Sequence, residues 1–193
     1  MLALARGGVA VGAPVAAVLK APLDLVLVRK IAAPKHPELA LGAVVDGDEP
    51  TIVYNRELQA LSGTSVAEFD AIRARELAEI ERQRILYLGK RSPLGVAGHL
   101  VIMVDDGIVT GATMRAAVRA TRRRGPAKLV LAVPVASPVA LASLRSKADE
   151  VVCLASPREF RSIGDFYDDF RPMTDEDVIG ILKRQPVAPV TLP

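Results

Sequence analysis

The chain of 193 residues lacks tryptophan and has one cysteine, two histidines, four phenylalanines and three tyrosines. A single cysteine, Cys153, excludes an internal disulfide and any metal site built from several cysteines. A single, unpaired cysteine also fits the reducing cytoplasm, where we expect the protein to reside. His36 and His99 have no partner at metal-ligand spacing. Because aromatic residues are scarce and half of the residues are hydrophobic, we expect Ala, Val, Leu and Ile to fill the core.

The sequence also lacks an apolar run that would predict a membrane span. The Ala-rich run after Arg6 superficially resembles a secretory signal, but glycines and Pro14 interrupt it and Lys20 ends it. We therefore expect a soluble protein. The net charge of +3 suits a polyanionic substrate but is too small and too diffuse to indicate nucleic-acid binding.

The most informative segment runs from Val101 to Thr113. Its first four residues predict a short buried strand, and Asp105 and Asp106 stand at the carboxyl end of that strand, where open α/β sheets place their ligands. A turn of small residues follows, and we expect Thr113 to cap the next helix. Backbone N–H groups beside a helix N-terminus favour a phosphate. The segment predicts a site for a phosphorylated sugar, unless the acids merely cap the turn or face solvent.

This segment is neither a Walker loop nor a dinucleotide fingerprint, because the Gly-Lys-Ser/Thr ending and the Gly-x-Gly-x-x-Gly pattern are both missing. It closely resembles the signature of type I phosphoribosyltransferases: an apolar strand, two acidic residues and then Thr-Gly-x-Thr. The resemblance implies that Asp105 and Asp106 are catalytic and bind the ribose hydroxyls of phosphoribosyl pyrophosphate, together with the cofactor Mg²⁺. It implies that the 5′-phosphate is held by Gly107, Ile108, Val109, Thr110, Gly111, Ala112 and Thr113.

Two further segments match the pyrophosphate side of the family's site. A strand over residues 2–5 leads into Arg6, Gly7 and Gly8, and a helix is expected over about Pro14–Leu19. In the family, a basic residue and glycines at this place form the pyrophosphate loop, because glycines let the backbone approach the diphosphate and arginine donates two hydrogen bonds. The alternative is an ordinary turn with a surface arginine.

A second strand over Leu23–Val28 is expected to deliver Arg29 and Lys30 to the same sheet edge. The next residues, Ala32–Pro37, contain two prolines and predict a loop. Family members often have a mobile loop here that supplies basic side chains to the pyrophosphate. Arg29 and Lys30 are therefore candidate pyrophosphate ligands, and a flexible basic surface loop is the alternative.

The aromatic residues near the C-terminus provide candidates for contacts with an acceptor base. Phe160, Phe166 and Tyr167 resemble the hood end of purine-type members, where a ring stacks on the base, but they could equally seal the end of the core. Val109 stands where 6-oxopurine members commonly carry a catalytic aspartate. Hypoxanthine–guanine salvage is therefore not expected, although this change leaves the phosphoribosyl site intact.

Strands that alternate with helices predict an α/β fold, a doubly wound and mainly parallel sheet flanked by helices with a small hood. We expect one domain over residues 1–184, in which about 29–90 hold the mobile loop, a hairpin and a long helix, and a Pro-rich tail over 185–193. The long helix follows a capping box that begins at Ser65 and runs to about Tyr87. Arg73 and Arg84 interrupt its apolar face and could pair with a second subunit, so a homodimer is an open alternative.

The predicted function is phosphoribosyl transfer from phosphoribosyl pyrophosphate to a small nitrogenous base, with Mg²⁺ and release of pyrophosphate. A non-catalytic regulator that senses phosphoribosyl pyrophosphate or a nucleotide is the main alternative. The arginines between Arg119 and Arg124 leave RNA binding as a third, less favoured reading, because no aromatic residues are interleaved with them. A solvated helix end explains that cluster equally simply.

Overall fold

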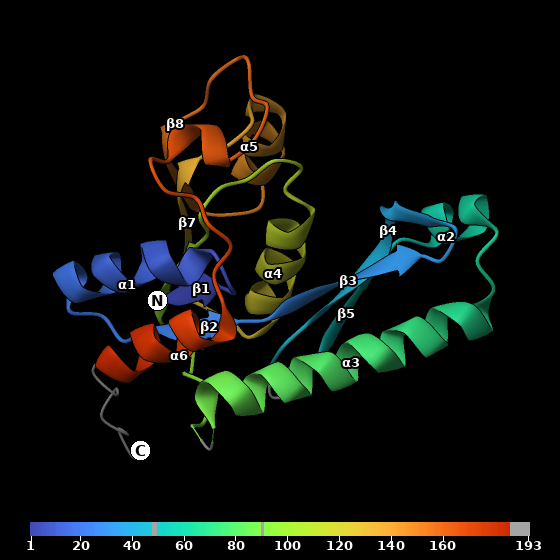
Figure 1. Ribbon diagram of the computed structural model, residues 1–193, viewed down its shortest axis with the longest axis horizontal. Coiled ribbons are helices and arrows are strands. Elements are labelled where there is room, and N and C mark those ends of the chain that lie inside the picture. The colour runs from blue at the N-terminus through green and yellow to red at the C-terminus, as the bar shows by residue number, and fades with distance from the viewer. Residues whose placement is uncertain (48–49, 90, 186–193) are drawn as a thin grey trace.

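The computed structural model describes residues 1–47, 50–89 and 91–185, in which a central five-stranded sheet supports most of the helices (Figure 1). All neighbouring strands of this sheet are parallel, in the order β2-β1-β6-β7-β8. The predicted doubly wound parallel sheet is thus confirmed. Its strands are β1 (Leu2–Leu4), β2 (Asp24–Val26), β6 (Leu100–Val104), β7 (Lys128–Val135) and β8 (Glu150–Ala155).

Both faces of the central sheet are covered, so its strands alternate between two hydrophobic cores. Leu2 and Leu4 pack with α4 (Ala112–Arg123) and α5 (Pro138–Arg145), whereas Ala3 packs with α1 (Gly8–Leu19) on the other face. The chain leaves β1 through α1 toward β2, and leaves β6 through α4 toward β7. Since β1 and β6 are neighbours, the chain runs from them toward opposite edges of the sheet, through α1 and α4 respectively. Such a switch point is where open α/β sheets bind ligands.

A three-stranded antiparallel sheet extends from the central sheet as an arm, which points to the right in Figure 1. Ile31, Leu41 and Ile80 are almost completely buried and join the arm's strands to its long helix. The same cluster includes Ala3 and Val9 of the body, so the core of the arm is continuous with that of the central sheet. The arm comprises β3 (Val28–Ala33), β4 (His36–Val45), β5 (Thr51–Tyr54), α2 (Arg56–Ser62) and α3 (Val66–Leu88).

The structure differs from the expected elements in three places before residue 40. The expected strand over Leu23–Val28 is β2 (Asp24–Val26), and Val28 already belongs to β3 of the antiparallel sheet, so Arg29 and Lys30 do not reach the edge of the central sheet. Helix α1 begins at Gly8 rather than Pro14, because the helix follows the Gly7 turn directly and accommodates Pro14 on its exposed side. Residues 32–37 are the end of a β-hairpin, not an irregular loop, and only Pro34 and Lys35 form its turn. The prolines excluded a helix but not a strand, because Pro37 lies beyond the part of β4 that pairs with β5.

Helix α3 confirms the predicted capping box, in which Ser65 and Glu68 exchange hydrogen bonds. Its two internal arginines pair within the chain: Arg73 lies 3.1 Å from Asp70, and Arg84 lies 3.3 Å from Asp46. Both arginines therefore have acidic partners within the chain.

The C-terminal part adds a short 3-10 helix (Gly164–Phe166) and α6 (Asp175–Arg184), which lies between α1 and α3 in Figure 1. Residues 186–193 of the predicted tail lie outside the described residues. No helix in the described ranges is both long and apolar enough to span a membrane.

Candidate active site

Two adjacent carboxylates stand at the carboxyl end of β6, beside the switch point of the sheet. Asp105 Oδ1 accepts a hydrogen bond from the Asp106 backbone N–H at 3.0 Å. Burial raises the pKa of the Asp105 carboxyl well above its ordinary value, and the neighbouring charge of Asp106 raises it further. Burial also raises the pKa of Asp106. Both carboxyls are therefore harder to ionise than an exposed aspartate, and a bound cation would favour their ionised forms.

Gly7 and Gly8, which follow β1, lie directly against these carboxylates. A Cβ atom on Gly7 would stand 1.8 Å from Asp106 Oδ2, and one on Gly8 would stand 2.6 Å from the Val104 carbonyl oxygen. Neither position therefore has room for a side chain. The structure thus brings the two turns that the sequence singled out into one site.

Arg6 lies at the entrance to this glycine turn, and its side chain is 47% exposed. Its Nη1 is 3.4 Å from Asp175 Oδ1, at the start of α6. The Tyr87 hydroxyl donates to the same Asp175 oxygen at 2.5 Å, and burial together with this hydrogen bond raises the pKa of Tyr87. Asp175 is separated from Arg6 by 169 residues, and sequence reasoning gave it no role beyond starting a helix.

The loop after the carboxylates is anchored from the β7–α5 junction. Ile108 donates its N–H to the Val135 oxygen at 3.0 Å and accepts from the Ser137 N–H at 2.8 Å. The Ser137 hydroxyl donates to the Val109 oxygen at 2.5 Å. Ser137 was missed by sequence reasoning, although its place before Pro138 and after a buried strand marks it as a helix cap next to the loop.

The anchored loop has backbone donors without partners in the described structure, and two of the residues that carry them, Val109 and Thr110, are exposed. Within the described residues, no hydrogen-bond acceptor is found for the N–H groups of Val109, Thr110 and Gly111. Gly111 has φ +72° and is the N-cap residue of α4, without a side-chain cap. The prediction that Thr113 caps this helix is therefore wrong. A glycine with left-handed backbone ends the turn two residues earlier, and Thr113 lies exposed in the first turn.

The segment after β8 folds over the start of the same loop. A Cβ on Gly107 would lie 2.7 Å from Ile163 Cγ2, so the loop fits closely beneath this segment. The Tyr167 hydroxyl donates to the Asp106 backbone oxygen at 2.6 Å. Burial raises the pKa of Tyr167, and the charges of Asp106 and Asp105 raise it further. Tyr167 therefore belongs to the site.

The side chains of Phe160 and Phe166, which were also predicted to stack on a base, cannot donate a hydrogen bond to the carboxylate turn as Tyr167 does. Phe160 and Phe166 stack on each other with ring centroids 5.5 Å apart. Tyr167 instead has Phe170 as its ring neighbour, at 5.1 Å. Of the three, Tyr167 is the one with a direct hydrogen bond to the carboxylate turn.

Arg29 and Lys30 lie on strand β3 rather than on a mobile loop, and the strand directs them apart. Arg29 Nε donates to Glu76 Oε2 on α3 at 2.9 Å. Lys30 Nζ donates to the Pro37 oxygen at 2.6 Å, and Lys30 lines a groove beside Thr113. The structure therefore does not bring these two side chains together as a pair of phosphate ligands.

The carboxylate pair is the part of the site that fits Mg²⁺. Among the described residues, no group of three or more His, Cys, Asp or Glu side chains could hold a metal ion. Mg²⁺, however, usually binds one or two carboxylates and takes its other ligands from waters and substrate phosphates. Asp105 and Asp106 thus suit a Mg²⁺ ion that arrives with a phosphorylated substrate.

These features define an α/β protein with two carboxylates, a glycine turn and a loop with backbone N–H groups unpaired among the described residues, all at the switch point of a parallel sheet. A model of the phosphoribosyl transferase domain matches residues 1–171, and the chain belongs to this family. Two Mycobacterium tuberculosis proteins, from strains CDC 1551 / Oshkosh and ATCC 25618 / H37Rv, are provisionally named phosphoribosyl transferases. Each is 39% identical to this chain over 184 residues. The match covers 95% of this chain but 41% of either relative, so the chain spans less than half of their length.

A solved structure from another organism is similar over nearly the whole chain. The protein TT1426 from Thermus thermophilus is 42% identical, with a TM-score of 0.78. The match covers 94% of this chain and 85% of TT1426. This similarity includes the arm as well as the central sheet, because 94% of the chain cannot be matched without both.

Proposed function

We propose that this chain transfers the 5-phosphoribosyl group from phosphoribosyl pyrophosphate to a nitrogenous base and releases pyrophosphate. The observation that carries the proposal is the turn after β6, where two carboxylates adjoin three backbone N–H groups that have no acceptor in the described structure. Carboxylates suit the hydroxyls of a sugar, and free N–H groups suit its phosphate. Membership of the phosphoribosyl transferase family supports the same reaction.

In this proposal each part of the site binds one part of the donor. Asp105 and Asp106 accept hydrogen bonds from the ribose hydroxyls. The N–H groups of residues 109–111 and the N-terminus of α4 hold the 5′-phosphate. Arg6, which is half exposed, reaches the diphosphate. Asp105 and Asp106 would also hold the Mg²⁺ of the donor, which neutralises charge on the leaving diphosphate.

The reaction breaks the bond between C1 of the ribose and the diphosphate oxygen, and the electron pair leaves with the diphosphate. Positive charge that develops on the sugar ring is stabilised by the nearby carboxylates, while Arg6 stabilises the negative charge of the leaving group. The acceptor nitrogen then forms the new bond to C1. Val109 cannot accept a proton, so we propose an acceptor base that releases its proton to water. We assign the contact with this base to Tyr167, which lies beside Asp106.

Calorimetric titration with phosphoribosyl pyrophosphate and Mg²⁺ tests the donor site. The parent should bind saturably, and the double variant Asp105→Asn/Asp106→Asn should not. Asp168→Asn/Asp169→Asn is the matched control, because it removes the same charge from an exposed Asp-Asp pair that lies outside the turn. Absence of binding by a folded parent, or equal loss in the control, would refute the assignment.

A screen of nitrogenous bases with a pyrophosphate readout tests the transfer itself. Pyrophosphate release that requires both an acceptor and the intact carboxylates supports the enzyme. Tight donor binding without release for any tested base would instead favour a non-catalytic regulator that senses the donor.

A further inference from the structure

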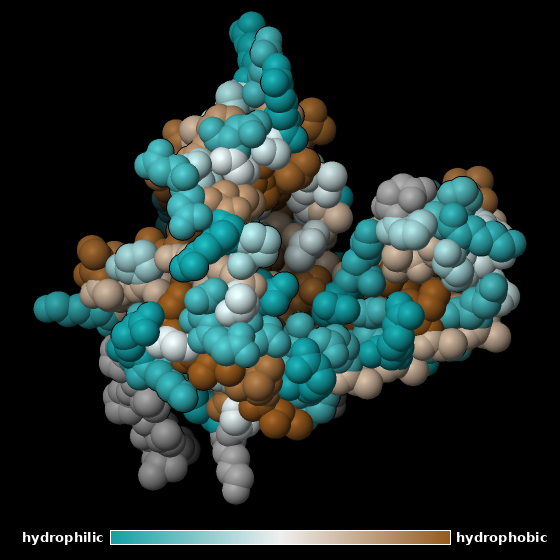
Figure 2. Space-filling view, viewed as in Figure 1, coloured by the Kyte–Doolittle hydropathy of each residue, from teal (hydrophilic) through white to brown (hydrophobic). Residues whose placement is uncertain are grey.

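A second concave region, of about 1220 Å³, lies between α4 and the antiparallel sheet of the arm. We call it the α4 groove. Figure 2 shows the surface hollowed between the body of the molecule and the arm. On one side it is lined by residues of α4, from Ala112 to Arg123, and on the other by β3, β4 and β5. Neither carboxylate of the candidate active site lines it.

The charge of the α4 groove is strongly one-sided. Its lining includes a single acidic side chain, Glu57, and six basic ones: Lys30, Arg115, Arg119, Arg122, Arg123 and Lys147. Three of the arginines recur at every fourth position of α4 and so lie on one face of the helix, about 6 Å apart along its axis. Like charges at this spacing destabilise a helix. Such a ladder therefore indicates an anionic occupant.

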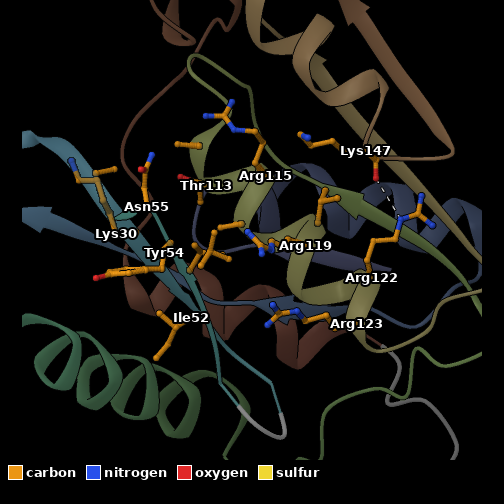
Figure 3. Close-up of a pocket in the computed structure, with 18 of the residues that line it drawn as sticks. Lys30, Ile52, Tyr54, Asn55, Thr113, Arg115, Arg119, Arg122, Arg123 and Lys147 are labelled. Atoms are coloured by element: carbon orange, nitrogen blue, oxygen red, sulfur yellow. Dashed lines mark hydrogen bonds between the residues drawn. The ribbon is translucent and has the colours of Figure 1, made fainter. Parts of the chain in front are cut away.

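Not every basic residue of the groove is available to a ligand. Arg122 points toward Lys147, away from the strands (Figure 3), and pairs with Asp149 at 2.8 Å. Arg115 donates to the Thr110 oxygen at 2.8 Å. In contrast, Arg119 and Arg123 make no ion pair or hydrogen bond with side chains of the described residues, and both point across the groove.

The wall opposite these arginines is mainly apolar. Figure 3 shows Ile52 and Tyr54 on the strands toward which Arg119 and Arg123 point. Lys30 stands on the same wall, nearer to Thr113. The groove thus offers guanidinium groups for phosphates on one side and an apolar surface for a flat ring on the other.

We propose that the α4 groove binds a nucleoside polyphosphate, with the phosphates on Arg119 and Arg123 and the base against Ile52 and Tyr54. The volume of the groove is sufficient, because ligand sites commonly have about 300–1,000 Å³. Two arginines spaced about 6 Å apart along the helix suit consecutive phosphates better than a single phosphate. This proposal does not depend on the transferase reaction.

The groove is also placed to affect the phosphate loop. Ala112 and Thr113 line it, and Arg115 connects its wall to the Thr110 oxygen. A ligand on the arginine ladder would therefore contact the same helix whose N-terminus completes the loop. The bound nucleotide would act as an effector of donor binding rather than as a substrate.

Calorimetric titration with ATP, in parallel with adenosine, tests the proposal. We expect saturable binding of ATP to the parent and none of adenosine. The charge reversal Arg119→Glu/Arg123→Glu should weaken ATP binding at least tenfold. Lys183→Glu/Arg184→Glu is the matched control, because it reverses two exposed basic residues in the last turn of another helix and should leave the affinity unchanged.

Asp105→Asn/Asp106→Asn distinguishes the groove from the candidate active site, and ATP binding should survive in it. The proposal is overturned if the parent does not bind ATP, or if these asparagines abolish binding while the arginine reversal does not. It is also overturned if a single-stranded oligonucleotide binds the arginine face more tightly than ATP and displaces it. Circular dichroism checks folding, and Arg119→Gln/Arg123→Gln replaces the reversal if that variant unfolds.

Discussion

Replacing either of the two glycines after β1 by alanine should have a different effect: Gly7→Ala should lower ligand affinity, and Gly8→Ala should lower stability. At Gly7 the new Cβ would meet the end of a side chain, Asp106 Oδ2 at 1.8 Å. A carboxylate can rotate away, so the fold should lose little stability, but the carboxylate leaves its place in the site. We expect Gly7→Ala to lower the affinity for phosphoribosyl pyrophosphate and Mg²⁺ at least tenfold, equivalent to about 1.4 kcal/mol.

At Gly8 the new Cβ would instead meet main-chain atoms. The Val104 oxygen would lie at 2.6 Å and Asp105 Cα at 3.0 Å, and neither can rotate away. The end of β6 must then shift relative to α1. Overpacking of this kind costs about 1–3 kcal/mol. For a domain of this size, each kcal/mol lowers the melting temperature by about 2–4 °C, so we expect a decrease of about 2–12 °C.

Gly12→Ala is the matched control, because it lies in the same helix. Its Cβ would meet side-chain atoms, Ala3 Cβ at 3.2 Å and Leu23 Cδ1 at 3.4 Å, and alanine favours the helix interior by about 1 kcal/mol. Its melting temperature should be nearly unchanged. Differential scanning fluorimetry and calorimetric titration measure the two quantities. The reasoning is refuted if Gly7→Ala loses stability but keeps its affinity, or if Gly8→Ala melts like Gly12→Ala.

Two further predictions concern charged groups. The pKa of Asp105 is raised by folding, so its favourable contribution to stability is present below its unfolded pKa of about 3.9 and is lost as the pH rises through the folded pKa. Asp105→Asn should therefore melt above the parent at pH 7–8, with a difference that shrinks toward pH 3.5; a constant difference would contradict this cause. Glu76 is almost fully buried and lies 2.9 Å from both Arg29 and Arg75. Glu76→Gln should therefore lower the free energy of unfolding in urea by about 1–3 kcal/mol, and an unchanged value would contradict a stabilising role for this pairing.

The central part of the fold and of the candidate site could be predicted because it is local in sequence. The apolar residues of β6, the two acids and the glycine-containing turn lie within thirteen residues, and each residue type limits the local backbone. Parallel order followed from the alternation of strands and helices. Even here, the cap of α4 was misplaced, because Gly111 and Thr113 both suit a helix start and only the backbone angle distinguishes them.

The other parts of the site depend on contacts between residues that are distant in sequence. Tyr167 reaches the Asp106 oxygen across 61 residues, and nothing in its local sequence indicates that partner. Arg29 and Lys30 look equivalent in the sequence, but on a strand consecutive side chains point to opposite faces. Recognition of β3 as a strand would have separated them. Pro34 and Pro37, near the end of β3, favoured the prediction of a loop instead.

The contact of Arg6 with Asp175 indicates how Arg6 can move to a bound diphosphate without disturbing the start of α6. The ion pair is long, at 3.4 Å, and Arg6 is half exposed, so the pair contributes at most about 1 kcal/mol. A diphosphate carries several negative charges and can therefore take Arg6 from Asp175. Asp175 would keep the hydrogen bond from Tyr87 at 2.5 Å and the nearby charge of Arg82 at 3.8 Å. Arg6 can thus turn to a ligand while the start of α6 remains held.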